Sequence, residues 1–331
     1  MTSHPRTADG PAAADVTHGD PEPTRPSGVR APSPPGRRAA AIRSGLAHFG
    51  VFGAPGVLVY AWFVLVPIGL SVYYSLTNAN PFNPPRRWVG LRNYRMLLHD
   101  QQFHTALRVT VTLTVIVVIV PNVLGLLVAL LLDRRGRFYH AMRSVFFTPM
   151  ILSSVVVSVI WTRLLDVDGP LNQALRGLGV HHPPAWLSDP DVALYSVASI
   201  ISWQMLGFCV VVYLAGLQSV PVELHEAAAI DGASAFGRFR AVTWPLLAPA
   251  VTINTVVLLI SAFKTYDYIK VITNGGPGAG TTATIAFDVL ATGFDSNHVG
   301  YASAMAVVML AIVCLATAVA LRILRAREID L

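Results

Sequence analysis

The sequence predicts an all-α integral membrane protein with six transmembrane helices and a cytoplasmic helical loop between the fourth and the fifth. Three observations predict this fold class. Hydrophobic residues make up 53% of the 331 residues and charged residues only 13%, about half the usual charged share of a soluble domain. Six apolar runs are each long enough to cross a hydrocarbon core of about 30 Å, which needs about 20 residues. The N-terminal segment and every second polar segment after it together contain more Lys and Arg than the remaining segments.

The six apolar runs are predicted to be helices. The hydrocarbon core contains no water, so every backbone polar group there must be hydrogen-bonded within its own segment. A very apolar but soluble helical globule is the alternative. We expect the spans near residues 51–76, 107–132, 144–165, 193–218, 246–269 and 299–322.

The distribution of Lys and Arg predicts the topology, because cytoplasmic loops of membrane proteins carry an excess of both. If residues 1–50 lie inside, the inside segments contain fourteen arginines: Arg6, Arg25, Arg30, Arg37, Arg38, Arg43, Arg134, Arg135, Arg137, Arg143, Arg238, Arg240, Arg325 and Arg327. The outside loops contain six basic residues: Arg86, Arg87, Arg92, Arg95, Arg176 and Lys270. This excess predicts cytoplasmic termini. The net charge of +6 is therefore a topology signal and not a nucleic-acid footprint.

Residues 1–48 form a separate zone rich in Pro, Ala, Arg, Ser and Gly. Such a segment cannot bury enough apolar surface to order itself, so we expect a disordered cytoplasmic tail followed by a transmembrane domain over residues 49–331. The first apolar run is long and starts late, which favours an uncleaved span over a secretory signal. Cys209 and Cys314 both fall in apolar runs, where a free cysteine behaves as a small hydrophobe.

The sequence contains no catalytic motif that we recognise. A phosphate-cradling loop requires Gly-x-x-x-x-Gly-Lys-[Ser/Thr], but the two lysines, Lys264 and Lys270, follow Phe263 and Ile269. We therefore expect no ATP hydrolysis, catalytic residue, cofactor or metal site in this chain. The run Gly275-Gly276-Pro277-Gly278 is interpreted as a flexible outside turn.

The polar segment 221–245 has the features of a docking element. Pro221 suits the first turn of a helix, and Glu223 and Glu226 lie near its positive end. Gly232 can adopt the left-handed conformation that ends a helix, and a second short helix is expected from about Ser234. The alanines between Glu226 and Gly232 leave little bulk, so the helix can enter a narrow groove on another protein. An ordinary connector on the membrane surface is the alternative.

The same segment resembles the cytoplasmic loop of permease subunits of binding-protein-dependent ABC importers. The resemblance rests on Glu226-Ala227-Ala228, Asp231-Gly232-Ala233 and Pro245. Two further stretches resemble sugar permeases of the maltose, lactose and glycerol-3-phosphate type of first membrane subunit: Trp88 to Tyr94, and the series Phe263–Asp267, Thr273–Pro277 and Gly300–Ala304. The resemblance covers residues 50–331. Trp244 departs from it, because an aliphatic residue usually precedes the proline; an indole suits the membrane interface.

This resemblance implies a role in ATPase coupling for six residues: Glu226, Ala227, Ala228, Asp231, Gly232 and Pro245. It implies a bacterial cytoplasmic (inner) membrane location, a second permease subunit, two ATP-binding subunits that hold ATP and Mg, and an extracytoplasmic solute-binding protein. The external loops 77–106 and 270–298 are candidates for contact with that protein. The implied substrate is a carbohydrate, an oligosaccharide in the first place, with a polyol or a glycerophosphodiester left open.

Polar residues within spans usually face a bundle interior or a water-filled cavity, so several are candidates for the substrate pathway. Sugars are held by aromatic faces and hydrogen-bonding side chains. For each candidate the alternative is a contact between helices or an anchor at the interface, and Lys264 and Asp267 can neutralise each other if they share a helical face. The candidates are Trp203, Gln204, Asn254, Tyr266 and Asp267.

Two other classes of function stay open. An ion-coupled secondary transporter usually contains inverted repeats and ionisable residues near mid-membrane, and no clear internal repeat is present. A membrane scaffold subunit without transport activity would tolerate loss of Glu226.

Overall fold

The computed structural model describes residues 53–134, 136–278 and 280–326. The predicted tail, residues 1–48, lies outside them. The chain divides into two units, one that ends at Ala61 and one that begins at Trp62. In the first unit, α2 (Ala54–Tyr60) is an apolar helix without buried residues. Within the described ranges all regular structure is helical, apart from an isolated bridge between Thr77 and Trp88.

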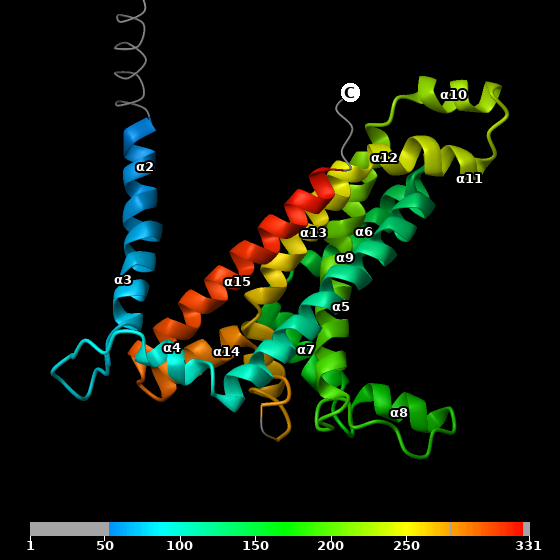
Figure 1. The fold of residues 1–331 in the computed structure, drawn as a ribbon. Coiled ribbons are helices and arrows are strands. Elements are labelled where there is room, and N and C mark those ends of the chain that lie inside the picture. The colour runs from blue at the N-terminus through cyan, green and yellow to red at the C-terminus, as the bar shows by residue number, and fades with distance from the viewer. Residues whose placement is uncertain (1–52, 135, 279, 327–331) are drawn as a thin grey trace, which may run out of the picture. The chain divides into compact units, whose positions relative to one another are not determined.

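The remaining elements follow in chain order (Figure 1). They are η2 (Ala61–Leu65), α3 (Val66–Ser75), α4 (Arg92–Leu97), α5 (Gln101–Leu132), α6 (Arg137–Ile151), α7 (Ser154–Leu164), α8 (Pro170–Gly177), α9 (Ala193–Gln218), α10 (Val222–Ile230), α11 (Ala235–Arg238), η3 (Phe239–Thr243), α12 (Trp244–Leu246), α13 (Ala248–Phe263), η4 (Ile269–Thr273), α14 (Ile285–Leu290), η5 (Ala291–Asp295) and α15 (Val299–Arg325).

Among the described residues, four helices are long and apolar enough to span a membrane: Ala54–Ser75, Gln101–Leu132, Ala193–Gln218 and Val299–Arg325. Two bent pairs also pass this test when each is taken together, Arg137–Ile151 with Ser154–Leu164 at 98° and Ala235–Leu246 with Ala248–Phe263 at 59°. The all-α membrane fold class is confirmed. The number of spans is six only if each bent pair crosses once, so six spans remains a prediction.

The third predicted span, 144–165, is broken where a straight helix was expected. Pro149 lies inside α6, and Leu152 is extended with ψ 144°. Proline removes a backbone donor and clashes with the preceding turn, so α6 ends shortly after it. A new helix, α7, then starts at Ser154 in a different direction.

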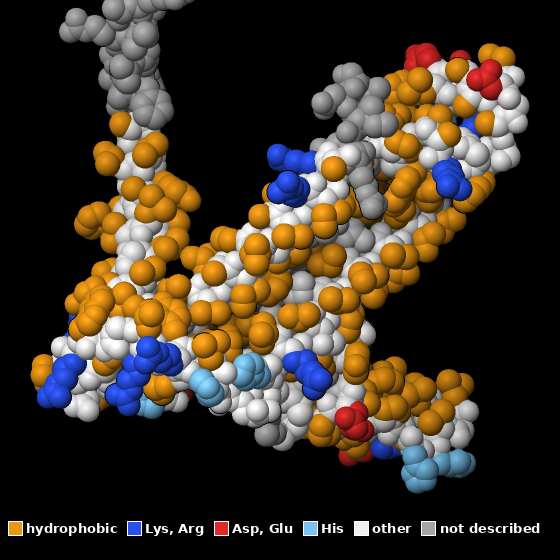
Figure 2. All heavy atoms as spheres, in the orientation of Figure 1, with side chains coloured by type: hydrophobic (Ala, Val, Ile, Leu, Met, Phe, Trp, Pro, Cys, Tyr) orange, Lys and Arg blue, Asp and Glu red, His pale blue; other side chains and the backbone are white. Residues whose placement is uncertain are grey.

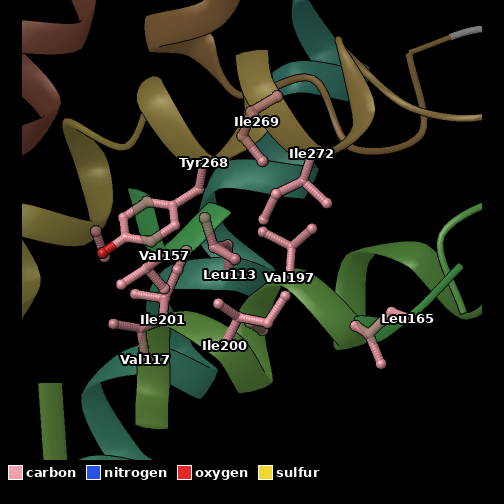
Figure 3. Packing of buried hydrophobic residues seen from close by; sticks show 12 residues of the cluster. Leu113, Val117, Val157, Leu165, Val197, Ile200, Ile201, Tyr268, Ile269 and Ile272 are labelled. Carbon is pink, nitrogen blue, oxygen red and sulfur yellow. The ribbon is translucent and has the colours of Figure 1, made fainter. Parts of the chain in front are cut away.

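The centre of the second unit is α9, which packs against α5, α6 and α13. A buried apolar cluster joins α5, α9 and α13 to α7 and η4; Figure 3 shows Leu113, Val157, Val197, Ile200 and Ile269 pointing toward one another. Lipid tails are as apolar as leucine, so close packing must hold such helices together. Two glycines permit that packing: a Cβ on Gly125 would lie 2.5 Å from the Cys209 Cβ, and one on Gly207 would lie 2.3 Å from the Phe146 carbonyl oxygen.

Within the second unit, the helical hairpin of α10 and α11 lies at one end and α4, α8 and α14 lie at the other (Figure 1). The predicted coupling loop and the predicted external loops therefore occupy opposite ends of the same bundle.

Candidate coupling loop and transport pathway

The loop between α9 and α13 is a helical hairpin. Pro221 immediately precedes α10, whose first residue is Val222. After α10, Gly232 has a φ of +78°, the left-handed conformation that the sequence led us to expect there. Ser234 then caps α11, which begins at Ala235, and its Oγ accepts a hydrogen bond from the Gly237 N–H at 3.2 Å.

The turn between the two helices is closed by backbone hydrogen bonds. The Ala233 N–H donates to the Ala228 carbonyl at 3.0 Å, and the Gly232 N–H donates to the Ala229 carbonyl at 3.1 Å. This pair of bonds is a Schellman motif, which satisfies carbonyls left free at a helix end. The Arg238 guanidinium adds a bond to the Ala233 carbonyl at 3.0 Å. The hairpin therefore has a defined shape of its own.

The hairpin is exposed and presents both charge and apolar surface. No residue of α10 is buried. Ile230 and Phe236 are 87% and 72% exposed, and Figure 2 shows acidic and hydrophobic side chains together at this end. Within the described residues, the exposed Glu226 carboxylate has no hydrogen-bond or ion-pair partner. Exposed apolar groups beside an unpaired charge are typical of a surface that another protein covers.

The other coupling candidates lie on the same hairpin or at its return to the bundle. Ala227, Asp231 and Gly232 are exposed, and Ala228 is half-buried. Pro245 is half-buried in α12. The short helix η3 connects α12 to α11, the second helix of the hairpin. Helical structure thus runs from the hairpin toward α13.

Gln204, a pathway candidate on α9, is buried at the break of the third span. Its Nε2 donates to the Leu152 carbonyl at 2.8 Å, and its Oε1 accepts from the Tyr268 hydroxyl at 2.6 Å. Leu152 is the residue that follows α6, so Gln204 satisfies a carbonyl exposed by the bend. The side chain holds three segments together, which is the inter-helix alternative considered above.

Asn254, on α13, is completely buried. Its side-chain nitrogen and oxygen have no hydrogen-bond partner among the described residues. Nearby, the Tyr213 hydroxyl of α9 donates to the Asn122 Oδ1 of α5 at 2.7 Å. Tyr213 and Asn122 thus form a polar contact between α9 and α5. The sequence predicted Asn254 but did not single out Tyr213, which gives no signal within an apolar run.

The other three pathway candidates lie nearer the break. Trp203 is half exposed and its ring meets Trp161 edge to face at 5.4 Å. The exposed Asp267 accepts a hydrogen bond from the Ser154 Oγ at 2.8 Å. A carboxylate is favoured there, because Ser154 starts α7 and a helix N-terminus carries partial positive charge.

Tyr266 is half-buried and stacks on Phe287 with ring centroids 6.2 Å apart. The expected pairing of Lys264 with Asp267 is wrong: α13 ends at Phe263, so the two residues do not share a helical face. Asp267 binds Ser154 instead.

Replacement of Gln204 by leucine is expected to lower the stability of the protein. The change leaves the Leu152 carbonyl and the buried Tyr268 hydroxyl without these partners, and an unsatisfied buried polar group costs about 1–3 kcal/mol. The apparent melting temperature in detergent measures the effect. Gln218→Leu, at the exposed end of the same helix, is the matched control, and equal losses from both variants would contradict this structural role.

A bundle of apolar helices with an exposed helical hairpin at one end defines a multi-pass membrane protein. The chain belongs to the family of binding-protein-dependent transport system inner membrane components, whose model matches residues 94–329. The resemblance noted from the sequence is thereby confirmed.

Two relatives illustrate the family. The chain is 33% identical over 277 residues to the trehalose/maltose transport system permease protein MalF of Thermococcus litoralis, covering 83% of this chain and 92% of that one. It is 31% identical over 278 residues to the sn-glycerol-3-phosphate transport system permease protein UgpA of Agrobacterium fabrum, covering 83% and 93%.

The fold is similar to a chain in the crystal structure of a bacterial alginate ABC transporter in complex with an alginate pentasaccharide-bound periplasmic protein. The TM-score is 0.75 at 20% identity, over 87% of this chain and 96% of that chain.

Proposed function

We propose that this chain is a permease subunit of an ATP-driven importer of a carbohydrate, an oligosaccharide in the first place. Family membership supports the importer class. The names of relatives such as MalF support a saccharide, whereas UgpA keeps a polyol phosphate open. A second permease, two ATP-binding subunits and an external solute-binding protein complete the proposed assembly in the bacterial cytoplasmic membrane.

The observation that carries this proposal is the exposed α10–α11 hairpin. Its Schellman motif fixes the turn. The Glu226 carboxylate without a partner and the exposed Ile230 and Phe236 are the features expected of a surface that binds another protein. An ATPase groove with an arginine or a backbone N–H group would pair with Glu226. The basic inside segments support placing this end of the bundle, and both termini, in the cytoplasm.

The proposed mechanism is a lever between two states. When the ATPase subunits close, they move the hairpin, and helical structure through η3 and α12 transmits the movement to α13. The bent α12–α13 junction, at 59°, is where a rotation of the hairpin would become a tilt of the span. ATP and the loaded binding protein change the populations of the two states only if each binds one of them more tightly.

The substrate pathway is proposed to pass the break of the third span. Asp267 and Trp203 are exposed there and can contact a sugar through a carboxylate and an aromatic face. Gln204 and Tyr266 are engaged with other residues and Asn254 is completely buried, so the three would line the pathway only after a rearrangement.

Uptake of labelled maltose, maltotriose and glycerol 3-phosphate into cells that express the complete system tests the proposal. Uptake of one of the saccharides should stop when ATP is depleted and should continue when an ionophore collapses the ion gradients while ATP is maintained. Uptake that survives ATP depletion but fails with the ionophore would replace the importer with an ion-coupled transporter.

A further inference from the structure

A cavity of about 470 Å³ lies between the start of α5, the loop after η4, and α14. These elements are at the end of the second unit opposite the coupling hairpin (Figure 1). The polar residues that line it include Gln101, Gln102, Asn274 and Asp288. The volume is in the range of small-ligand pockets and far above the roughly 30 Å³ share of one water molecule. The cavity therefore admits an organic group.

Asp288 contributes a buried carboxylate to this cavity. The residue is 1% exposed, and its Oδ1 accepts a hydrogen bond from the Gln102 Nε2 at 3.3 Å. Its Oδ2 is buried and has no hydrogen-bond partner among the described residues. An ionised carboxylate has about four acceptor positions, and leaving a buried one unused is unfavourable. The free oxygen indicates that a donor is missing from the isolated chain.

The surroundings favour a positively charged donor. None of the described residues that line the cavity is Lys, Arg or His. The nearby Lys270 is paired with Asp295 at 3.9 Å. Asp100 adds negative charge: its Oδ1 accepts from the backbone at the start of α5, and its Oδ2 accepts from the Tyr301 hydroxyl.

The aromatic residue of the cavity does not offer a free face to a sugar ring. Phe287 is stacked by Tyr266 at 6.2 Å, and the Lys270 Nζ lies over its ring at 5.7 Å. A Cβ on Gly275 would approach the same ring to 3.0 Å. Charge and hydrogen bonding, and not stacking, therefore characterise this site.

We propose that the cavity receives an arginine or lysine side chain of the external solute-binding protein, whose cationic group binds Asp288. The identity of this partner rests on the proposed function. A guanidinium suits the site, because its five N–H donors can serve a carboxylate and the amide oxygens of Gln101 or Asn274. Since the Asp288 Oδ2 is buried in the isolated chain, docking must open a path from the cavity to this atom. The inserted side chain would then hold the two proteins together beside α14. Because α14 packs against α5 and α15, movement of these helices would change the position of the bound side chain.

The proposed pairing is pH-dependent. Burial raises the pKa of Asp288 to about 6, the Asp100 carboxylate acts in the same direction, and the hydrogen bond from Gln102 opposes both. The other titratable groups around the site are Tyr301 on α15, His298 before it, and the Lys270–Asp295 pair. Only the ionised carboxylate attracts a cation strongly, so affinity should fall about tenfold for each pH unit below about 6.

Binding of a probe to the purified full chain in lipid nanodiscs tests the site. The probe is Nα-acetyl-arginine amide, compared by saturation-transfer NMR at pH 7.5 with its neutral counterpart, Nα-acetyl-citrulline amide. We expect the arginine probe to bind at least tenfold more tightly than the citrulline probe. Asp288→Asn should remove that preference. Equal binding of both probes, or a preference that survives Asp288→Asn, would overturn the proposal.

Two further variants guard against misfolding. Gln101 is exposed at the mouth of the cavity, so Gln101→Trp should block probe binding without disturbing Asp288. Asp295→Asn removes an exposed carboxylate near the same loop and should leave the probe preference unchanged. If Asp295→Asn weakens binding as much as Asp288→Asn does, the effect is one of surface charge and the proposed site is wrong.

The source of the cation is tested by competition in cells. The arginine probe, and not the citrulline probe, should inhibit substrate uptake, because it competes with the side chain of the binding protein; the inhibition should be absent in Asp288→Asn. Probe binding without inhibition of uptake would contradict the proposal that the cation is a side chain of the binding protein. That result can be told apart from a failure of the proposed function, because in the latter case the cells would show no ATP-dependent uptake at all.

Discussion

Glu226→Lys is expected to reduce ATP-driven uptake at least thirtyfold while the chain remains in the membrane. Glu226 is exposed on α10 and has no partner among the described residues, so its replacement leaves the hairpin intact. In the proposed complex the carboxylate pairs with a cation or a backbone N–H of the ATPase. Breaking a buried charge pair at an interface costs about 2–5 kcal/mol, and a lysine adds repulsion to that loss.

The measurement is uptake of the labelled substrate, normalised to the amount of the chain in the membrane. Glu223→Lys is the matched control, because it makes the same charge reversal on the same exposed helix. It weakens the favourable interaction with the helix N-terminus by only about 0.3–1 kcal/mol and should retain most uptake. Full uptake by Glu226→Lys, or equal loss in both variants, would contradict a specific coupling role.

Gly207→Val is expected to prevent folding of the bundle. Gly207 lies on α9, and a Cβ there would be 2.3 Å from the Phe146 carbonyl oxygen and 3.1 Å from the Phe147 Cα. Both contacts are with the backbone of α6, which cannot turn aside as a side chain can. The two helices must separate, so we expect a loss of more than about 3 kcal/mol, above the usual range for overpacked cores.

The yield of monodisperse protein after size-exclusion chromatography, together with the apparent melting temperature, measures this effect. Gly69→Val is the control: Gly69 lies in α3, and nothing is within 4 Å of the position of an added Cβ. It should behave like the original protein. A Gly207→Val variant that melts within 2–3 °C of the original protein, about the shift expected for less than 1 kcal/mol in a chain of this size, would show that α6 and α9 do not touch as described.

The sequence could predict those elements that depend on local chemistry. Long apolar runs predict helices because a span must satisfy its own backbone, and the described helices follow those runs. Gly232 is predictable because a left-handed residue is needed where α10 turns back, and glycine adopts that conformation without strain. Apolarity alone predicts a span from about residue 107, whereas α5 begins at Gln101. Asp100 caps the helix at Gln101.

The rest depends on contacts between distant segments. The bend after Pro149 is compatible with the sequence, but it needs Gln204 to donate to the Leu152 carbonyl, and the Tyr268 hydroxyl donates to the Gln204 Oε1 in turn. Asp288 was not singled out, because its burial arises only when Gln102, 186 residues earlier in the chain, packs against it. The roles of Trp203, Asn254 and Asp267 in transport stay predictions for the same reason, since they concern a state with substrate bound.

The most direct test of the central claim is to purify the tagged chain from its native membrane in mild detergent and to identify the proteins that accompany it by mass spectrometry. We expect an ATPase with Walker motifs and a second six-span permease. The ATPase alone should be lost when Glu226 is replaced by lysine. Recovery of the chain without an ATPase, or an ATPase that stays bound to the Glu226→Lys variant as firmly as before, would contradict docking through the α10–α11 hairpin.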